Sequence, residues 1–257
     1  MKKKVLSIAG SDPSSGAGLQ VDLKVFQALG AYGMAIPAAL TVQNSRGVAA
    51  VEPVPSSMLA KQIEALLSDI TPDAIKTGML LTKRNILAVA RVMREYRIRN
   101  LVIDPVLRSS SGKALLQPAA ISSLKKALFP LARIITPNIP EAEALTGIAI
   151  KSGQDMDFAA GILLDMGPAF VLIKGGHLLG AAVDTLYGGK SVLSFSTNRR
   201  KGDFHGTGCV LSAAITVFIS QGLSVEKAVE KAKQRVDRML KTARPMGKNK
   251  NLKYFIF

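Results

Sequence analysis

Short apolar runs alternate with amphipathic stretches along most of the chain. The strand-like runs are unbroken, as in residues 5–9, whereas residues 56–70 repeat apolar positions at helical spacing behind a candidate N-cap, Ser56. The pattern predicts strands at residues 5–9, 34–42, 74–76, 101–103, 133–135 and 170–173, and helices at 19–29, 56–70, 82–96, 118–127 and 155–166. Unbroken apolar strands joined by helices are typical of a mostly parallel sheet that is covered on both faces.

The last third of the chain has a different pattern. Residues 181–195 predict a small antiparallel hairpin at one end of the sheet, and two helices follow at residues 207–221 and 224–243. The lysine-rich residues 246–257 are interpreted as a basic tail. Because no internal repeat or break in composition divides the chain, we expect one α/β domain over residues 1–257.

Composition narrows the class of protein. Hydrophobic residues make up 48% of the 257 positions and charged residues 20%, which is typical of a globular protein. The net charge of +16 favours anionic ligands such as nucleotides and phosphorylated metabolites, although a solvated basic surface would give the same balance. There is no arginine-rich tract, no zinc-finger spacing and no Trp, so we expect no nucleic-acid partner.

Cys209 is the sole cysteine, so no intrachain disulfide can form, which fits a reducing compartment. The apolar run after the first lysines ends by Gly10 and is too short for a signal peptide. The most apolar helical candidate, residues 210–219, is too short to span a bilayer. We therefore expect a cytoplasmic protein with no membrane partner.

Ligands of parallel sheets bind beyond the carboxyl ends of the strands, so the loops there are the candidate sites. The first such loop, GSDPSSGAG at residues 10–18, has glycines that let the backbone approach a ligand, with Asp22 one turn into the next helix. No Lys-Ser/Thr pair follows these glycines, so the loop is not a Walker A motif. A flexible turn is the alternative interpretation.

Two further loops carry carboxylates. Asp104 directly follows a predicted strand, where it could hold Mg²⁺ through water or simply start a turn before Pro105. Asn138 and Glu141 have the spacing of a helix capping box. The functional alternative assigns Glu141, or Asn138 with it, to a site for metal and phosphate.

The fourth loop is HGTGC at residues 205–209, which runs into the apolar helix. Backbone N–H groups at a helix N-terminus form a ready anion site, and the two glycines permit a close approach. Lys174 ends another predicted strand, and its ammonium group could neutralise phosphate charge.

Taken together, these segments resemble the hydroxymethylpyrimidine/phosphomethylpyrimidine kinases of thiamine biosynthesis. The segments that carry the resemblance follow the family's order over about residues 5–240: residues 5–29, ALTVQNSRG at 39–47, KTGML at 76–80, DPV at 104–106, ITPNIPEAEALTG at 135–147, KGGHL at 174–178 and HGTGC at 205–209. The resemblance implies a ribokinase-like three-layer α/β/α sandwich. It also implies Mg²⁺- and ATP-dependent phosphorylation of 4-amino-5-hydroxymethyl-2-methylpyrimidine and then of its monophosphate, by a homodimer.

The same resemblance assigns residues to three parts of the site. The pyrimidine pocket would comprise Gly10, Asp22, Gln43, Met79, Val106 and Cys209, with Asp22 or Gln43 bonding the ring nitrogens and amino group. The ATP side would comprise Asp104, Thr136, Asn138, Glu141 and Lys174, with Asp104 and Glu141 on the metal. The anion hole would comprise Gly206, Thr207, Gly208 and Cys209.

Cys209 stands where most of the ribokinase-like superfamily has an Asp base. A thiol at a helix N-terminus tends towards a lowered pKa, so our hypothesis is that a Cys209 thiolate accepts the hydroxyl proton. The alternative is that Cys209 only packs against the substrate.

The sequence departs from the family pattern in three places: residues 201–204, residues 247–254, where a Gly/His-rich signature is usual, and Ser14-Ser15, where a Gly is often found. The nearest alternative function is a pyridoxal kinase of the same superfamily, although Gln43 and Met79 favour the pyrimidine. The remaining alternatives are a non-catalytic nucleotide- or vitamin-binding regulator and a basic nucleic-acid-binding protein.

Overall fold

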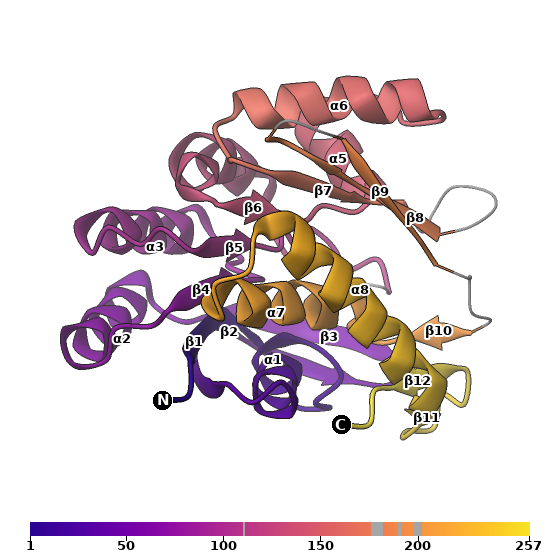
Figure 1. Ribbon diagram of the computed structural model, residues 1–257. Helices are drawn as coiled ribbons and strands as arrows, with labels where there is room; N and C mark the ends of the chain where they lie inside the picture. Colours follow the sequence, from indigo (N-terminus) through magenta and orange to yellow (C-terminus); the bar gives the residue numbers. More distant parts are fainter. Residues whose placement is uncertain (110, 176–181, 190–191, 198–201) are drawn as a thin grey trace.

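Strands and helices alternate along the chain in the computed structural model, which describes residues 1–109, 111–175, 182–189, 192–197 and 202–257 (Figure 1). The strands are β1 (Lys4–Ser11), β2 (Tyr32–Asn44), β3 (Gly47–Pro53), β4 (Ala74–Thr77), β5 (Leu101–Ile103), β6 (Ile134–Ile135), β7 (Val171–Lys174), β8 (Ala182–Tyr187), β9 (Leu193–Thr197), β10 (Asp203–Phe204), β11 (Arg244–Pro245) and β12 (Leu252–Tyr254). The helices are α1 (Gly18–Ala28), α2 (Ser56–Asp69), α3 (Lys83–Glu95), α4 (Ile121–Ser123), α5 (Ile139–Thr146), α6 (Gly153–Asp165), α7 (Thr207–Ser220) and α8 (Val225–Thr242).

The main sheet, over the described residues, has the strand order β3-β2-β1-β4-β5-β6-β7-β8-β9. The six central strands β2, β1, β4, β5, β6 and β7 run parallel to one another, while β3 is antiparallel at one edge and the β8–β9 hairpin is antiparallel at the other. This confirms the predicted mostly parallel sheet with an antiparallel hairpin, although Ala181, Lys190 and Ser191 of that prediction lie outside the described residues. The order reverses beside β1, and ligand sites of such sheets form at a reversal.

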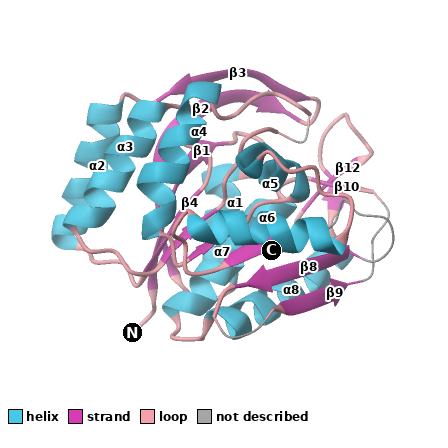
Figure 2. Cartoon of the chain, turned by 90° about the horizontal axis from the view of Figure 1, so that it is seen from above, coloured by secondary structure: helices cyan, strands magenta, loops and turns pink. Residues whose placement is uncertain are grey.

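Two apolar cores lie on opposite faces of the sheet. Successive strand residues alternate between them, so Leu6 and Ile103 belong to one core while Val5 and Val102 belong to the other. Helices α2, α3, α5 and α6 cover the first face, and α1, α7 and α8 cover the second (Figures 1 and 2). The strands are unbroken apolar runs because both of their faces are buried, and the predicted three-layer α/β/α arrangement is confirmed.

Some local predictions were wrong. The edge strand β3 was not predicted, and Ser56 is the first residue of α2, whose N-cap is Pro55. The helix predicted at residues 118–127 is a succession of short turns, η1 (Pro118–Ala120), α4, the π-turn η2 (Leu124–Leu128) and η3 (Phe129–Leu131). Pro118 at the first position of η1 is compatible with a helix, whereas Pro130 in η3 has no N–H with which a helix could continue past it.

The C-terminal residues are not the predicted basic tail. Strand β12 pairs in parallel with β10 and antiparallel with β11, so the end of the chain is held in a second, three-stranded sheet. Tyr254 and Phe255 are buried, at 5% and 4% exposed. These two apolar side chains anchor the segment, while its lysines remain at least partly exposed. None of the described helices is both long enough and apolar enough to cross a bilayer.

Candidate active site

The parallel strands bring the predicted site residues to one edge of the sheet. The carboxyl ends of β1, β4, β5, β6 and β7, or the turns that follow them, carry Gly10, Met79, Asp104, Thr136 and Lys174. Helix α7 begins against this edge. A Cβ built on Gly208 in its first turn would lie 3.1 Å from Lys174 Nζ and 3.7 Å from Asp104 Oδ2. The anion-hole loop and the ATP-side residues are therefore neighbours, as the resemblance implies.

Asp104 is the centre of a buried polar cluster. Its Oδ1 accepts hydrogen bonds from Lys174 Nζ at 3.1 Å and Thr136 Oγ1 at 3.3 Å, and its Oδ2 accepts one from Ser212 Oγ at 3.2 Å. Burial alone would raise the pKa of Asp104, but Lys174 and Lys76 outweigh it and lower that pKa. Asp104 is therefore a carboxylate at neutral pH. Ser212, on α7, was not predicted because nothing in the sequence distinguishes it from the apolar residues around it.

Glu141 and Asn138 form the predicted capping box at the start of α5. Asn138 Oδ1 accepts the backbone N–H of Glu141 at 2.9 Å, and Glu141 Oε2 accepts that of Asn138 at 2.8 Å. Burial raises the pKa of Glu141 to about 7, with Asp104 adding to the rise and Lys174 opposing it. The described residues hold no group of three His, Cys, Asp or Glu side chains suited to a metal. Mg²⁺ needs only one or two carboxylates beside water and phosphate, and the Asp104–Glu141 pair fits that.

The N-terminus of α7 is built to receive an anion. Its N-cap, Gly206, has a φ of 76° in the left-handed region, and a Cβ there would collide with the carbonyl oxygen of Gly16. Only glycine suits this position. Gly206 also has no side chain that could bond to the N–H groups of the first turn. These N–H groups are therefore free to bind an anion in the space beside Lys174.

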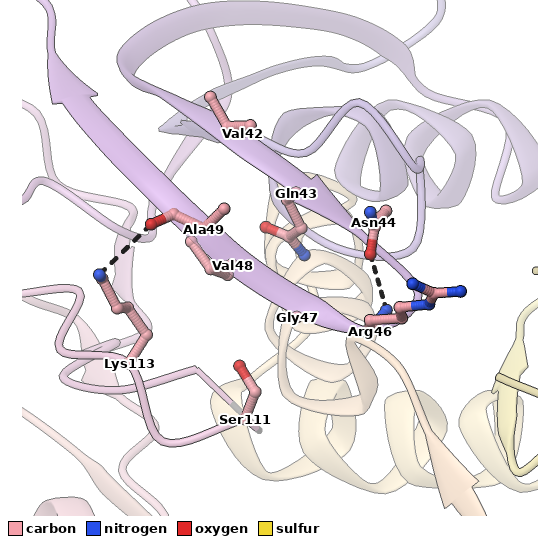
Figure 3. A pocket seen from close by; sticks show the side chains of 9 residues that line it. All are labelled: Val42, Gln43, Asn44, Arg46, Gly47, Val48, Ala49, Ser111 and Lys113. Carbon is pink, nitrogen blue, oxygen red and sulfur yellow. Dashed lines mark hydrogen bonds between the residues drawn. The ribbon is translucent and has the colours of Figure 1, made fainter. Parts of the chain in front are cut away.

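The predicted pyrimidine residues lie around a small apolar cluster. Gly10 contacts the side chain of Met79, and Met79 packs with Ala39, Leu81 and Leu115, with Val48, Val51 and Val106 partly buried against them. Val48 also lines an adjoining pocket of about 490 Å³ between the β2–β3 hairpin and the loop that holds Ser111 and Lys113 (Figure 3). Gln43 lines that pocket as well. Val48 therefore joins the pocket that contains Gln43 to the apolar cluster around Met79.

Asp22 is fully buried and ion-paired. Its Oδ2 accepts hydrogen bonds from Lys76 Nζ at 2.7 Å and Ser7 Oγ at 2.6 Å, and both members of the ion pair are 0% exposed. Its Oδ1 is buried and has no hydrogen-bond partner among the described residues, which leaves one acceptor of the carboxylate unsatisfied. Burial would lower the pKa of Lys76, but Asp22 and other nearby negative groups raise it, so Lys76 stays charged. The sequence analysis did not predict this ion pair, although a lysine within a buried strand, such as Lys76 in β4, indicates that a buried carboxylate lies nearby.

Burial acts against the hypothesis of a lowered pKa at Cys209. Burial raises the pKa of the Cys209 thiol to about 12, the charges of Asp104 and Asp22 add to the rise, and Lys76 opposes it. Cys209 is therefore a neutral thiol at physiological pH.

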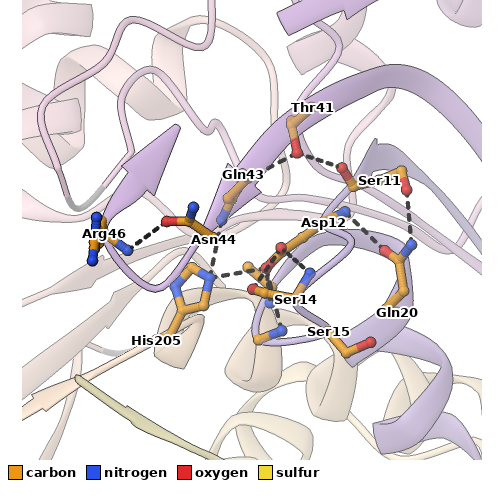
Figure 4. A network of polar contacts seen from close by, with 12 residues as sticks. Ser11, Asp12, Ser14, Ser15, Gln20, Thr41, Gln43, Asn44, Arg46 and His205 are labelled. Atoms are coloured by element: carbon orange, nitrogen blue, oxygen red, sulfur yellow. Dashed lines mark hydrogen bonds and ion pairs between the residues drawn. The ribbon is translucent and has the colours of Figure 1, made fainter. Parts of the chain in front are cut away.

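Asp12 and His205 form a polar network that sequence reasoning missed (Figure 4). Asp12 Oδ1 accepts hydrogen bonds from the N–H and hydroxyl of Ser14 at 2.8 and 2.7 Å, and Asp12 Oδ2 lies 2.9 Å from His205 Nε2. Burial would raise the pKa of Asp12, but the bonds from His205 and Ser14 lower it. Ser15 has a φ of 59°, which is strained for a residue with a side chain at the place where glycine is often found. His205 Nε2 also lies 3.0 Å from Gln43 Nε2.

Comparisons with known proteins agree with this arrangement. Residues 12–253 match the family model described as phosphomethylpyrimidine kinase. The chain is 42% identical over 234 residues to a hydroxymethylpyrimidine/phosphomethylpyrimidine kinase of Bacillus subtilis, a match that covers 89% of this chain and 86% of that one. It is 44% identical over 246 residues to a bifunctional thiamine biosynthesis protein of Geobacter sulfurreducens. That match covers 95% of this chain, which spans about 50% of the length of the bifunctional protein.

Solved structures show the same fold. The crystal structure of a phosphomethylpyrimidine kinase from Clostridium difficile 630 has a TM-score of 0.84 and 45% identity, and the match covers 93% of this chain and 100% of that one. A pyridoxal kinase from Staphylococcus aureus in complex with ADP has a TM-score of 0.91 and 37% identity, covering 100% of this chain and 93% of that one. The predicted ribokinase-like fold is confirmed.

Proposed function

The chain belongs to the phosphomethylpyrimidine kinase family, and from this we propose the reaction that its site performs. It is a phosphotransferase that moves the terminal phosphoryl group of ATP to the hydroxymethyl group of 4-amino-5-hydroxymethyl-2-methylpyrimidine. It then phosphorylates the monophosphate to the diphosphate, in thiamine biosynthesis. The observation that carries this proposal is the contact of Lys174 and Asp104 with the N-terminal turn of α7.

Phosphoryl transfer needs in-line positioning and stabilisation of charge on the phosphoryl oxygens, and little covalent chemistry from the protein. The first N–H groups of α7 and the ammonium of Lys174 would supply that stabilisation from two directions. Asp104 and Glu141 would hold Mg²⁺, which neutralises phosphate charge when bound. Thr136 and Asn138, which both lie between β6 and α5, would line the nucleotide side.

The pyrimidine would bind on the other side of the α7 N-terminus. The unpartnered Asp22 Oδ1 would accept the ring amino group, and the Gln43 amide would bond a ring nitrogen. Met79 and Val106 would pack against the ring. Because the Cys209 thiol is neutral, we assign it to packing against the substrate, and a loose transition state requires little help from a base.

The assay that tests this proposal measures Mg-ATP turnover of the pyrimidine, its monophosphate and pyridoxal in parallel. The proposal predicts the highest kcat/KM for the two pyrimidines. A pyridoxal kinase is the second candidate, because the Staphylococcus aureus enzyme matches the whole chain at the higher TM-score. Turnover of pyridoxal alone would move the assignment to that activity, and turnover of none of the three would refute both.

We further propose a cytoplasmic homodimer that does not bind nucleic acid. Leu40 and Val42, at 54% and 64% exposed on β2, give the sheet an apolar surface next to its edge strand β3 that a second copy could cover. Light scattering on the purified protein would show twice the 27.2 kDa chain mass, and a monomer at micromolar concentration would contradict it.

A further inference from the structure

The C-terminal strand is hydrogen-bonded directly to the start of the anion-hole loop. Strand β12 pairs with β10 so that Lys253 lies opposite Phe204, and the next residue, His205, donates its N–H to Lys253 O at 2.9 Å. Lys253 Nζ lies 5.5 Å from the centre of the Phe204 ring, a cation–π contact that supports this register. The conformation of the residues that lead into α7 therefore depends on the end of the chain.

Tyr254 fixes the position of the His205 ring. The two rings meet edge to face, with centroids 5.3 Å apart and an interplanar angle of 78°. Both side chains are buried, and Gly16 fills the remaining space, because a Cβ there would collide with both rings. Little room is left for the imidazole to turn or shift while Tyr254 stays in place.

A single ring nitrogen of His205, Nε2, lies within hydrogen-bond distance of two groups. Its Nε2 lies 2.9 Å from the Asp12 carboxylate and 3.0 Å from the amide nitrogen of Gln43, and a single ring nitrogen cannot donate to the first and accept from the second. The bond to the carboxylate is charge-assisted and about twice as strong as a neutral one, so the proton of Nε2 points to Asp12. Thr41 Oγ1 donates a hydrogen bond to Gln43 Oε1 at 3.3 Å, and the His205 ring bounds the amide on its nitrogen side. Because His205 Nε2 does not accept from the amide, the N–H groups of Gln43 are available to a ligand.

The C-terminal segment also holds the turn that follows Gln43. Asn249 donates its backbone N–H to Ser45 Oγ at 3.4 Å and its Nδ2 to Ser45 O at 3.2 Å, and Gly247 packs against the same serine. Ser45 is only two residues beyond Gln43. Both the side-chain surroundings and the backbone of Gln43 are therefore set by contacts with residues 247–254.

We propose that the C-terminal strand is part of the substrate site, in which Tyr254 holds His205 and His205 presents the Gln43 amide to the pyrimidine. Tyr254 is a positioning residue, since it acts through another side chain. The proposal rests on the proposed function for its substrate, and it gives a role to a segment in which the sequence departs from the family pattern.

The kinetic test compares Tyr254→Ala with Tyr254→Phe, which keeps the ring, and with Phe257→Ala, which removes an exposed ring from the same segment. Loss of an edge-to-face contact should raise KM for the pyrimidine about 3- to 10-fold in Tyr254→Ala. KM for ATP and the values for the two controls should stay within about twofold of the wild type. An equal rise in both KM values, or no rise, would contradict the proposal.

A double-mutant cycle separates positioning from general loosening. If Tyr254 acts through Gln43, Tyr254→Ala should raise KM no further once Gln43 is replaced by Ala. If the two substitutions instead raise KM by factors that multiply, Tyr254 acts independently of Gln43 and the proposal is overturned. Should Tyr254→Ala fail to fold, Tyr254→Leu keeps the apolar volume and completes the same cycle.

A measurement without substrate keeps this inference separate from the proposed function. The chain has two histidines, so long-range ¹⁵N–¹H spectra can resolve His205 after a His177→Gln substitution. We expect the Nε2–H tautomer, with a resonance that shifts in Tyr254→Ala and not in Phe257→Ala. The Nδ1–H tautomer, or a resonance indifferent to Tyr254, would refute the inference even if pyrimidine turnover is found. Absence of pyrimidine turnover in the wild type would instead refute the proposed function alone.

Discussion

Replacing Lys76 by Met tests the buried charge beneath the pyrimidine site. The pair of Lys76 and Asp22 is fully buried, with a separation of 2.7 Å. Methionine has a similar length and fills the same space, so the substitution removes the positive charge and little volume. Asp22 then remains with only Ser7 as a donor.

The expected cost follows from what is left behind. Removing one partner of a buried ion pair destabilises a protein by about 3–5 kcal/mol, because the other charge stays buried without compensation. Burial already raises the pKa of Asp22, and Lys76 is the strongest influence that opposes the rise. The variant is therefore expected to protonate Asp22, which turns an acceptor for the ring amino group into a donor.

Urea unfolding followed by circular dichroism measures the loss of stability. With a slope of about 1–3 kcal/mol per M, Lys76→Met should lower the unfolding midpoint by more than about 1 M. The matched control is the double variant Lys76→Met/Asp22→Asn, which removes both charges and should regain most of that loss. Unchanged stability in the single variant, or a double variant less stable than the single one, would refute the reasoning.

Three further predictions concern the phosphate side and the thiol. Lys174→Met should lower kcat by about 10²- to 10³-fold with little change in KM for the pyrimidine, and a fall below tenfold in steady-state assays would remove Lys174 from the proposed role. Gly206→Ala should weaken ATP binding in calorimetry because of the collision with Gly16, whereas Gly153→Ala, whose Cβ meets no atom within 4 Å, should bind as the wild type does. Cys209, with a pKa near 12, should be ionised in only about one molecule in 10⁵ at pH 7, so its alkylation by iodoacetamide should be slow and should keep rising with pH through pH 10. A plateau below pH 8 would restore the thiolate hypothesis.

The parallel sheet and its active edge were predictable because their signals are local. Unbroken apolar runs such as residues 101–103 mark strands buried on both faces, and strand direction then places Asp104 and Lys174 at the same edge. The capping box of Asn138 and Glu141 was also readable from spacing alone.

The remaining features depend on contacts between distant segments. Strand β3 lies at a sheet edge and is largely exposed, so burial leaves no apolar pattern in its sequence. The strand near the C-terminus exists because β10 pairs with it, and the bond between Asp12 and His205 joins residues 193 positions apart. The pKa of Cys209 depends on how many atoms surround the sulfur, which motif spacing does not encode.

The central claim is that this site transfers a phosphoryl group to a pyrimidine that already carries one. Phosphorus-31 NMR of the monophosphate incubated with Mg-ATP and the protein tests it most directly. The account predicts two coupled resonances of a new pyrimidine diphosphate that grow together with ADP, and their near absence in Lys174→Met. ADP without a new diphosphate, or no reaction in the wild-type protein, would contradict it.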